Sequence, residues 1–269
     1  ARVNLLVFNV TSARLGAMMF LQFFVWGAWY VTIGNYMAAQ GMADLAHWPY
    51  TVNPIAAIIA PFFLGLVADR FFAAEKVFGT LHILGGLVMF AVPQATGTPG
   101  LFILLLLFYN LCYMPTLGLA NSLAFHNIEN QEQQFPMIRV FGTIGWIAAG
   151  LFIGFVLGQF SGEEMPDRTP LPLYTTAIAS LALGAYSFTL PHTPPLAAGQ
   201  PVSVQSIAGV DALRLLGSRS FYIFIGCSFL ICIPLAAYFS FAPIFVANTV
   251  YDQGVSNALV DMLPNPSSL

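Results

Sequence analysis

The sequence predicts an all-α polytopic membrane protein, because its composition leaves too little polar surface for a water-soluble fold. Hydrophobic residues make up 58% of the 269 residues and charged residues only 7%, which is far fewer charges than a soluble domain carries. The apolar residues also gather in long stretches. Since roughly 20 apolar residues in a helix cross a bilayer core about 30 Å thick, these stretches are candidate transmembrane helices.

Seven apolar segments follow one another along the chain, separated by polar loops. Six fill most of the sequence up to residue 190, and a seventh begins near its end. The fourth holds no charged residue between Leu101 and Phe125. The expected spans are 15–38, 51–68, 77–95, 101–125, 136–160, 171–190 and 219–249.

The basic residues predict which side of the membrane each loop occupies. Six of the eight basic residues fall before the first span, between spans two and three, or before the seventh: Arg2, Arg14, Arg70, Lys76, Arg214 and Arg219. The opposite loops hold only Arg168, and Arg139 opens the fifth span. Because cytoplasmic loops carry the excess of Lys and Arg, we expect a cytoplasmic amino terminus.

The chain changes character between the sixth and seventh spans. Residues 191–218 hold four prolines among small residues, which is typical of a linker. Six spans, a cytoplasmic linker and a further span are the layout of a transporter made of two six-helix halves. The predicted division is an amino-terminal bundle at 1–190, a linker at 191–218, and the first helix of the second bundle with its following loop at 219–269. We expect the chain to be a fragment.

A short charged loop follows the second span. It contains Gly65, Asp69 and Arg70, where the glycine permits close helix approach and the carboxylate can cap or pair with a helix end. The loop resembles the Gly-x-x-x-Asp-Arg loop of the major facilitator superfamily, which implies a role in alternating access. An ordinary charged turn outside the membrane is the alternative.

Two spans carry polar and aromatic residues at the same helical spacing. Gln22, Trp26 and Trp29 in the first span lie at i, i+4 and i+7, within about 60° of one another around the helix. An amide in a span needs a polar partner, so Gln22 indicates either contact between helices or the lining of a cavity.

The fifth span repeats this geometry with Arg139, Thr143 and Trp146. A guanidinium suits the hydroxyl and carbonyl groups of a polar solute, and an indole can stack on a planar ring. Because Arg139 follows Pro136 closely, it can instead extend to the cytoplasmic surface. The glycines of this span, Gly142, Gly145, Gly150 and Gly154, favour close helix packing.

Other polar residues are less informative about function. Asn110, Tyr113 and Thr116 in the fourth span favour hydrogen bonds between helices over a cavity.

Every acidic residue falls in a loop or at a span margin, so no relay carboxylate or histidine is expected within the spans. The three cysteines form no CxxC pair, which argues against metal sites, and a net charge of −3 argues against nucleic acid.

Several motifs together resemble the nucleoside:proton symporters, a bacterial branch of the major facilitator superfamily. They run in order through residues 20–29, 65–70, 113–119 and 135–146. The resemblance implies twelve helices in two bundles in a bacterial inner membrane, with protons as the coupling ion and no other cofactor. It also implies that Arg139, Thr143 and Trp146 contact a nucleoside, with coupling carboxylates beyond Leu269. Gln22 and Trp26 are further candidates for substrate binding. Nothing implies an oligomer.

Two other functions compete with nucleoside transport. A sugar or oligosaccharide proton symporter of the same superfamily would use the arginine and the aromatic rings on a pyranose. A membrane-embedded enzyme or a sensor is a further alternative. The histidines, His47, His82, His126 and His192, are scattered along the chain, which disfavours a catalytic pair.

Overall fold

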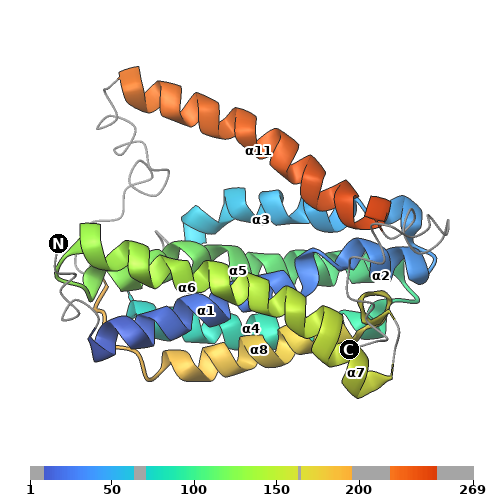
Figure 1. The fold of residues 1–269 in the computed structure, drawn as a ribbon, viewed down its shortest axis with the longest axis horizontal. Helices are drawn as coiled ribbons and strands as arrows, with labels where there is room; N and C mark the ends of the chain where they lie inside the picture. Colours follow the sequence, from blue (N-terminus) through green and yellow to red (C-terminus); the bar gives the residue numbers. More distant parts are fainter. Residues whose placement is uncertain (1–8, 64–70, 163–164, 196–218, 247–269) are drawn as a thin grey trace, which may run out of the picture.

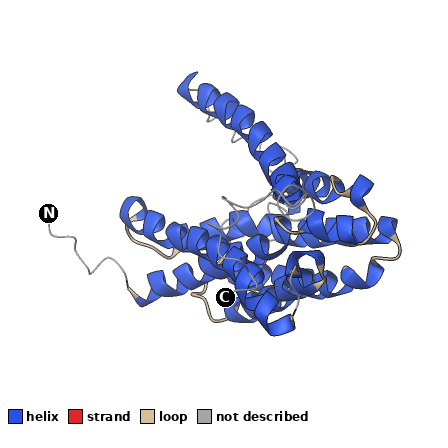
Figure 2. Ribbon diagram, turned by 45° about the vertical axis from the view of Figure 1, so that its right-hand side comes forward, coloured by secondary structure: helices blue, strands red, loops and turns tan. Residues whose placement is uncertain are grey.

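The computed structural model describes residues 9–63, 71–162, 165–195 and 219–246. These residues form a bundle of long helices, with no strand among them (Figures 1 and 2). Helices in a bilayer satisfy their own backbone groups, so this architecture agrees with the fold class expected from composition.

Each expected span coincides with a helix or a closely joined helix pair. The first span is α1 (Val10–Tyr30) and α2 (Ile33–Ala39), followed by the short η2 (Ala43–Leu45). The others are α3 (Trp48–Phe63), α4 (Ala74–Ala91) with η4 (Pro93–Ala95), α5 (Pro99–His126), α6 (Gln131–Leu151) with η5 (Phe152–Leu157) and α7 (Gly158–Ser161), α8 (Leu171–Ser187) after η6 (Pro166–Arg168), and α11 (Arg219–Val246).

Five of the helical segments in the described part of the chain are long and apolar enough to cross a membrane. They are Val10–Ala39, Ala74–Ala95, Pro99–His126, Gln131–Phe160 and Arg219–Pro243. The described parts of α3 and α8 have 16 and 17 residues, slightly fewer than the roughly 20 that a full span needs.

Polar side chains begin the helices at the amino-terminal end of α1 and α6. Asn9 accepts a hydrogen bond from the backbone N–H of Ser12 at 2.8 Å, and Asn130 accepts one from Gln133 at 3.1 Å. Each asparagine satisfies a donor that the first helical turn leaves unpaired. At α5, Pro99 occupies the first turn. Proline has no backbone N–H, but a first-turn N–H has no partner within the helix, so no helical hydrogen bond is lost there.

The helices pack in two connected groups, one of α1 and α6 and the other of α3, α4, α5 and α8 (Figure 1). α1 packs most extensively against α6, and α4 lies between α5 and α8. α3 packs on α5, while α1 also contacts α8 and so joins the two groups. Two large clusters of buried apolar residues fill most of the interior, one around Trp29, Tyr109 and Phe102 and the other around Met18, Phe78 and Leu123, and a third, smaller cluster lies where α1 meets α6 and η5.

The start of the predicted linker is anchored to the bundle. The buried carboxylate of Glu75 in α4 accepts hydrogen bonds from Nδ1 of His192 at 2.9 Å and from the backbone N–H of Thr193 at 3.0 Å. The carbonyl of Thr193 also accepts from the N–H of Ala74 at 2.9 Å. The residues just after α8 are therefore bound to the start of α4 and belong to the bundle. The rest of the predicted linker, from residue 196, lies outside the described residues.

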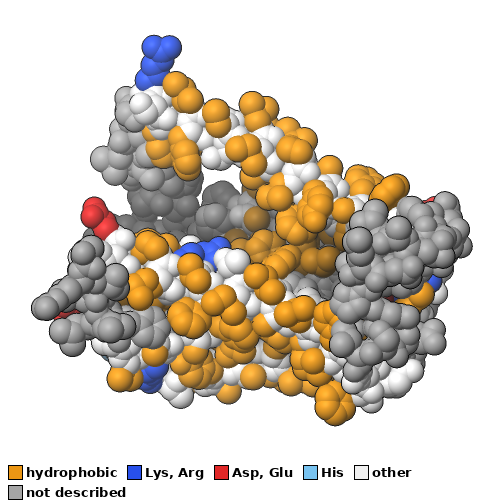
Figure 3. Space-filling view, viewed as in Figure 1, with side chains coloured by type: hydrophobic (Ala, Val, Ile, Leu, Met, Phe, Trp, Pro, Cys, Tyr) orange, Lys and Arg blue, Asp and Glu red, His pale blue; other side chains and the backbone are white. Residues whose placement is uncertain are grey.

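α11 stands apart from the bundle along most of its length. It meets α2 near its carboxyl end and diverges from α3 toward Arg219 (Figures 1 and 2). Its apolar side chains are largely exposed, including Phe224, Phe229 and Leu230. In the space-filling view, hydrophobic side chains cover both this helix and much of the neighbouring face, with an open cleft beneath the helix (Figure 3).

Candidate functional site

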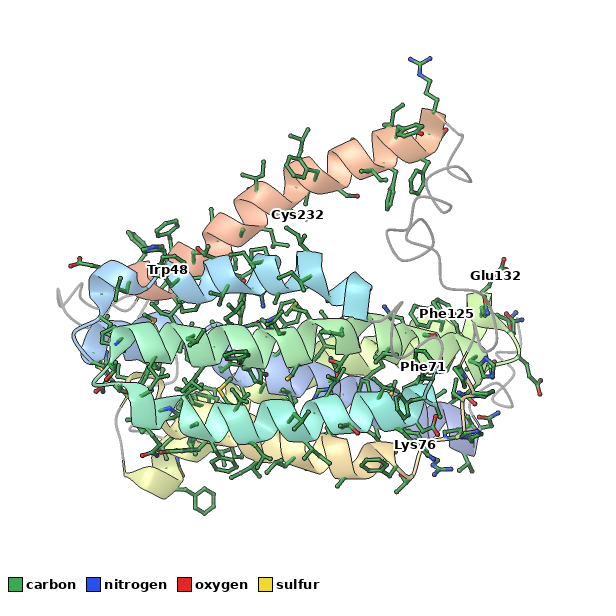
Figure 4. The ribbon with its side chains drawn as sticks, turned by 180° about the vertical axis from the view of Figure 1, so that it is seen from behind. Trp48, Phe71, Lys76, Phe125, Glu132 and Cys232 are labelled. Carbon is green, nitrogen blue, oxygen red and sulfur yellow. The ribbon has the colours of Figure 1, made fainter. Side chains whose placement is uncertain are left out.

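A cavity of about 550 Å³ lies between α1, α3, α6 and α11. Its size falls within the range of about 300–1,000 Å³ typical of small-molecule sites. The cavity is lined by Phe23, Trp26 and Tyr30 from α1, Tyr50, Asn53 and Pro54 from α3, Arg139, Gly142, Thr143 and Trp146 from α6, and Cys232, Leu235, Ala236 and Phe239 from α11. Figure 4 shows Cys232 on α11, on the side nearer α3.

The α6 stripe predicted from the sequence faces this cavity. Arg139, Thr143 and Trp146 all line it, because their spacing places them on one side of the helix. The guanidinium carbon of Arg139 lies 4.1 Å from the centre of the Phe23 ring, in cation–π geometry. Among the described residues, the guanidinium has no ion pair or hydrogen bond, so its N–H donors are available to a bound solute.

Aromatic rings form the part of the cavity wall shared by α1, α6 and α11. Trp26 meets Trp146 edge to face with ring centres 5.5 Å apart. Trp146 in turn meets Phe239 of α11 at 5.8 Å, and Trp26 lies 5.5 Å from Tyr30. Such rings offer flat apolar surfaces on which a planar ring can stack.

Trp146 and Phe239 also separate two cavities. A second cavity of about 440 Å³ is lined by both rings together with Thr32, Asn35 and Asp167. There the amide of Asn35 donates to Asp167 Oδ2 at 2.7 Å, which joins α2 to η6. The aromatic pair therefore stands between the Arg139 cavity and a smaller cavity that contains Asn35 and Asp167.

Sequence reasoning missed the polar residue that α3 brings to the cavity. Asn53 is 8% exposed and donates from Nδ2 to Oδ1 of Asn110 on α5 at 2.9 Å. An amide within an otherwise apolar span was the available signal, since such a group needs a polar partner. Asn110 itself forms the contact between helices that its position in the fourth span predicted.

Gln22 is the one predicted binding residue that does not line the cavity. Its side chain is fully buried between helices, where Nε2 donates to Oγ1 of Thr116 at 2.8 Å. Its Oε1 lies 2.7 Å from Nε2 of His82. Of the two interpretations of this glutamine, the structure supports contact between helices, because both ends of the amide are occupied by protein groups.

A histidine lies within one of the spans, where no relay histidine was expected. His82 is 1% exposed in the middle of α4, with Nδ1 3.1 Å from Oγ of Ser180. Thr116 donates its hydroxyl to the carbonyl of Tyr113, so it must accept from Gln22, which leaves Gln22 Oε1 facing His82. Nε2 of His82 therefore carries the hydrogen. The sequence signal for His82 was its position within the predicted span 77–95.

Charge is sparse around the cavity. Arg139 is the only charged residue among the described lining residues. No group of three His, Cys, Asp or Glu side chains that could hold a metal ion occurs in the part of the chain that the structure describes. The predicted conformational loop with Gly65, Asp69 and Arg70 lies outside the described residues, so its role stays a prediction.

The helical bundle, with a further helix crossing beside a cavity of aromatic and polar side chains, has the architecture of a major facilitator transporter. The chain belongs to the nucleoside H⁺ symporter family, because the family model described as "Nucleoside H+ symporter" matches residues 9–262.

Several characterised or named relatives are similar to the chain. The "Putative nucleoside transporter YegT" of Escherichia coli K12 is 45% identical over 233 residues, covering 86% of this chain and 54% of the relative. The "Nucleoside permease NupG" of the same organism is 34% identical over 217 residues, covering 78% and 50%. The "Xanthosine permease" of the same organism is 33% identical over 246 residues, covering 87% and 54%. These relatives are permeases and transporters rather than enzymes.

The fold is also similar to crystal structures of the nucleoside transporter NupG. A mutant of that protein superposes with a TM-score of 0.77 at 29% identity, covering 96% of this chain and 63% of the crystallised chain. A second NupG structure gives a TM-score of 0.71 at 30% identity, covering 97% and 63%. The chain spans about half the length of the curated relatives it matches.

Proposed function

We propose that the complete protein containing this chain takes up nucleosides across a bacterial inner membrane by proton-coupled alternating access. The observation that carries this proposal is the convergence of Arg139, Thr143, Trp146 and Trp26 on one cavity beside α11. Membership of the nucleoside H⁺ symporter family and the similarity to named nucleoside transporters support the substrate class.

The lining residues suit the two parts of a nucleoside. The guanidinium of Arg139 offers donors to base carbonyls or ribose hydroxyls, and the Thr143 hydroxyl can donate or accept. Trp146 and Trp26 offer ring surfaces against which a base can stack. A nucleoside carries no charge, so one cation without a facing carboxylate is compatible with such a ligand.

The proton is the only coupling ion that the proposal requires, with no other cofactor. The acidic groups that would bind it are expected beyond Leu269, since the acidic residues of the described spans lie at helix ends. The proposed setting is a lipid bilayer with the amino terminus in the cytoplasm, in accordance with the six basic residues on that side. The proposal involves no nucleic acid and requires no oligomer.

A sugar symporter is the competing function. The "Maltose permease" of Geobacillus stearothermophilus is 25% identical to the chain over 221 residues, covering 81% of this chain and 52% of the relative. Aromatic stacking and an arginine also suit a pyranose ring. The nucleoside transporters are more similar to the chain, so nucleosides are the substrate class we favour.

Removing the Arg139 guanidinium tests the proposal. A hydrogen bond from a charged group contributes about 1.5–3 kcal/mol, so Arg139→Ala should weaken uridine binding roughly ten- to a hundredfold. The measurement is equilibrium binding of uridine to the purified full-length protein, with maltose and other sugars as competitors.

Lys76→Ala is the matched control, because Lys76 is an exposed basic residue at the start of α4 and does not line the cavity. Its uridine affinity should equal that of the parent protein. If Arg139→Ala also bound uridine like the parent, the arginine would not belong to the site. Competition by sugars but not by nucleosides would replace the proposed substrate class with sugars.

A further inference from the structure

We propose that Asn53 forms a second polar subsite in the cavity, which accepts a hydrogen bond from a donor group of the bound nucleoside. The inference rests on the proposed function and extends it from α6 to α3. Asn53 lines the cavity while its side chain is more than nine-tenths buried. Its place in the wall is set by α5, against which α3 packs.

The orientation of the Asn53 amide follows from its neighbour on α5. Nδ2 of Asn110 donates to the carbonyl of Leu106, one turn earlier in the same helix, at 2.8 Å. A flipped amide would place two acceptors against each other, so Oδ1 of Asn110 must point toward Asn53. Asn53 therefore donates from Nδ2 to Asn110. The chain of contacts fixes both amides.

This arrangement leaves the carbonyl oxygen of Asn53 as the free end of the amide. Oδ1 has no hydrogen-bond partner among the described residues, and Asn53 is one of the residues that line the cavity. This oxygen is not one of the fully buried atoms that lack a partner, so it stays accessible, and a bound solute can donate a hydrogen bond to it. Because Asn110 holds the amide in place, little ordering is needed when the solute binds.

Asn53 and Arg139 would recognise opposite hydrogen-bonding groups. Arg139 can only donate, so it selects acceptors such as base carbonyls, whereas Oδ1 of Asn53 can only accept. A nucleoside presents donors as ring N–H groups of the base and as ribose hydroxyls. A site built to accept from such a donor discriminates strongly against analogues that lack it.

The test combines a variant of Asn53 with uridine analogues that each lack one donor. The probes are uridine, 3-methyluridine, 2′-deoxyuridine, 3′-deoxyuridine and 5′-deoxyuridine, measured by equilibrium binding to the full-length protein. Asn53→Leu should weaken uridine binding roughly tenfold, as expected for one hydrogen bond. One analogue should bind the parent protein roughly tenfold more weakly than uridine and should bind the variant with no further loss. That analogue identifies the donor.

A second variant guards against a purely structural effect. Asn53→Leu alone leaves Oδ1 of Asn110 buried without a donor, whereas replacing Asn53 and Asn110 together by leucine removes both amides. The double variant should show the same analogue pattern as the single one. Equal losses for uridine and all four analogues, or unchanged uridine binding, would overturn this inference while leaving the proposed function intact. Failure of the parent protein to bind any of the nucleosides would overturn both.

Discussion

His82 joins four helices through side-chain contacts. On α4, its ring contacts Gln22 of α1 and Ser180 of α8, while Gln22 extends the network to Thr116 of α5. The Ser180 hydroxyl lies 3.1 Å from Nδ1 and 2.9 Å from the carbonyl oxygen of His82, and these two acceptors share its single hydrogen, because Nε2 carries the ring hydrogen. Each buried polar group finds its partner on another helix, so the network favours one arrangement of the bundle over others.

Replacing His82 should therefore destabilise the bundle. His82→Leu leaves Gln22 Oε1 buried without a donor, which costs about 1–3 kcal/mol. We expect a lower Tm in thermal unfolding of the purified full-length protein in detergent. His126→Leu is the control, since His126 is exposed at the end of α5, and its Tm should match the parent. A His82→Leu protein as stable as the control would show that the network contributes little.

The contrast between Gln22 and Arg139 shows which side-chain contacts could be predicted from the sequence. Both are polar residues on apolar helices, and the spacing predicted both stripes. Gln22 turns away from the cavity because His82 and Thr116, distant in sequence, lie beside it. Periodicity defines a face of a helix but not what packs against that face. Asn53 went unnoticed for the same reason, since its significance depends on Asn110.

At the scale of the helix, a close crossing holds α1 against α6. A Cβ atom added at Gly145 would overlap the carbonyl oxygen of Phe20 and lie 2.8 Å from its carbonyl carbon. A Cβ at Gly27 would lie 3.1 Å from the Cβ of Ala149, so the helices approach closely from both sides. Small residues permit such contacts between transmembrane helices. This crossing positions the Arg139 face relative to Trp26.

Gly145→Val should separate the two helices, because the obstructing atoms belong to the backbone and cannot rotate away. Overpacking of this kind costs at least about 1–3 kcal/mol. The expected results are a lower Tm of the full-length protein and weaker uridine binding. Gly150→Val, in the same helix, meets no heavy atom within 4 Å and should leave both quantities unchanged. Equal effects of the two substitutions would argue against the crossing.

The glycines of α6 and η5 show how much of the helix packing could be predicted from the sequence. Gly142, Gly145, Gly150 and Gly154 were expected to pack closely, but only Gly142 and Gly145 do so. The positions of the spans follow from hydropathy, whereas the breaks within them do not. The hydroxyl of Thr32 lies 3.1 Å from the carbonyl of Trp29 where α1 gives way to α2, and η5 winds as a π-helix after α6. These features depend on local hydrogen bonding that composition does not record.

For the whole molecule, the described helices run back and forth between two ends of the bundle, as the sequence predicted. Lys76, Phe71, Phe125 and Glu132 lie at one end of the bundle, and Trp48 lies at the opposite end (Figure 4). α11 begins at Arg219 on the same side as Lys76. The sequence could predict this alternation because each span reverses the chain direction. It could not predict how α11 tilts, since that depends on packing against α2.

Cysteine labelling can establish which end faces the cytoplasm. Thr98 and Glu132 are both exposed in loops or first turns at opposite ends of the bundle, so each offers an accessible position for one cysteine. In intact cells, a membrane-impermeant thiol reagent should label Thr98→Cys but not Glu132→Cys, because the basic loops are retained on the cytoplasmic side. Both should react once the cells are opened.

The background for this measurement is the full-length protein with Cys112, Cys227 and Cys232 replaced by serine, so that only the introduced cysteine of this part of the chain can react. Labelling of Glu132→Cys from outside, with Thr98→Cys protected, would reverse the orientation. The Arg139 end of the cavity would then face the exterior, because Arg139 lies about two turns from Glu132 on α6. The open cleft beneath α11 (Figure 3) would then open outward instead of toward the cytoplasm.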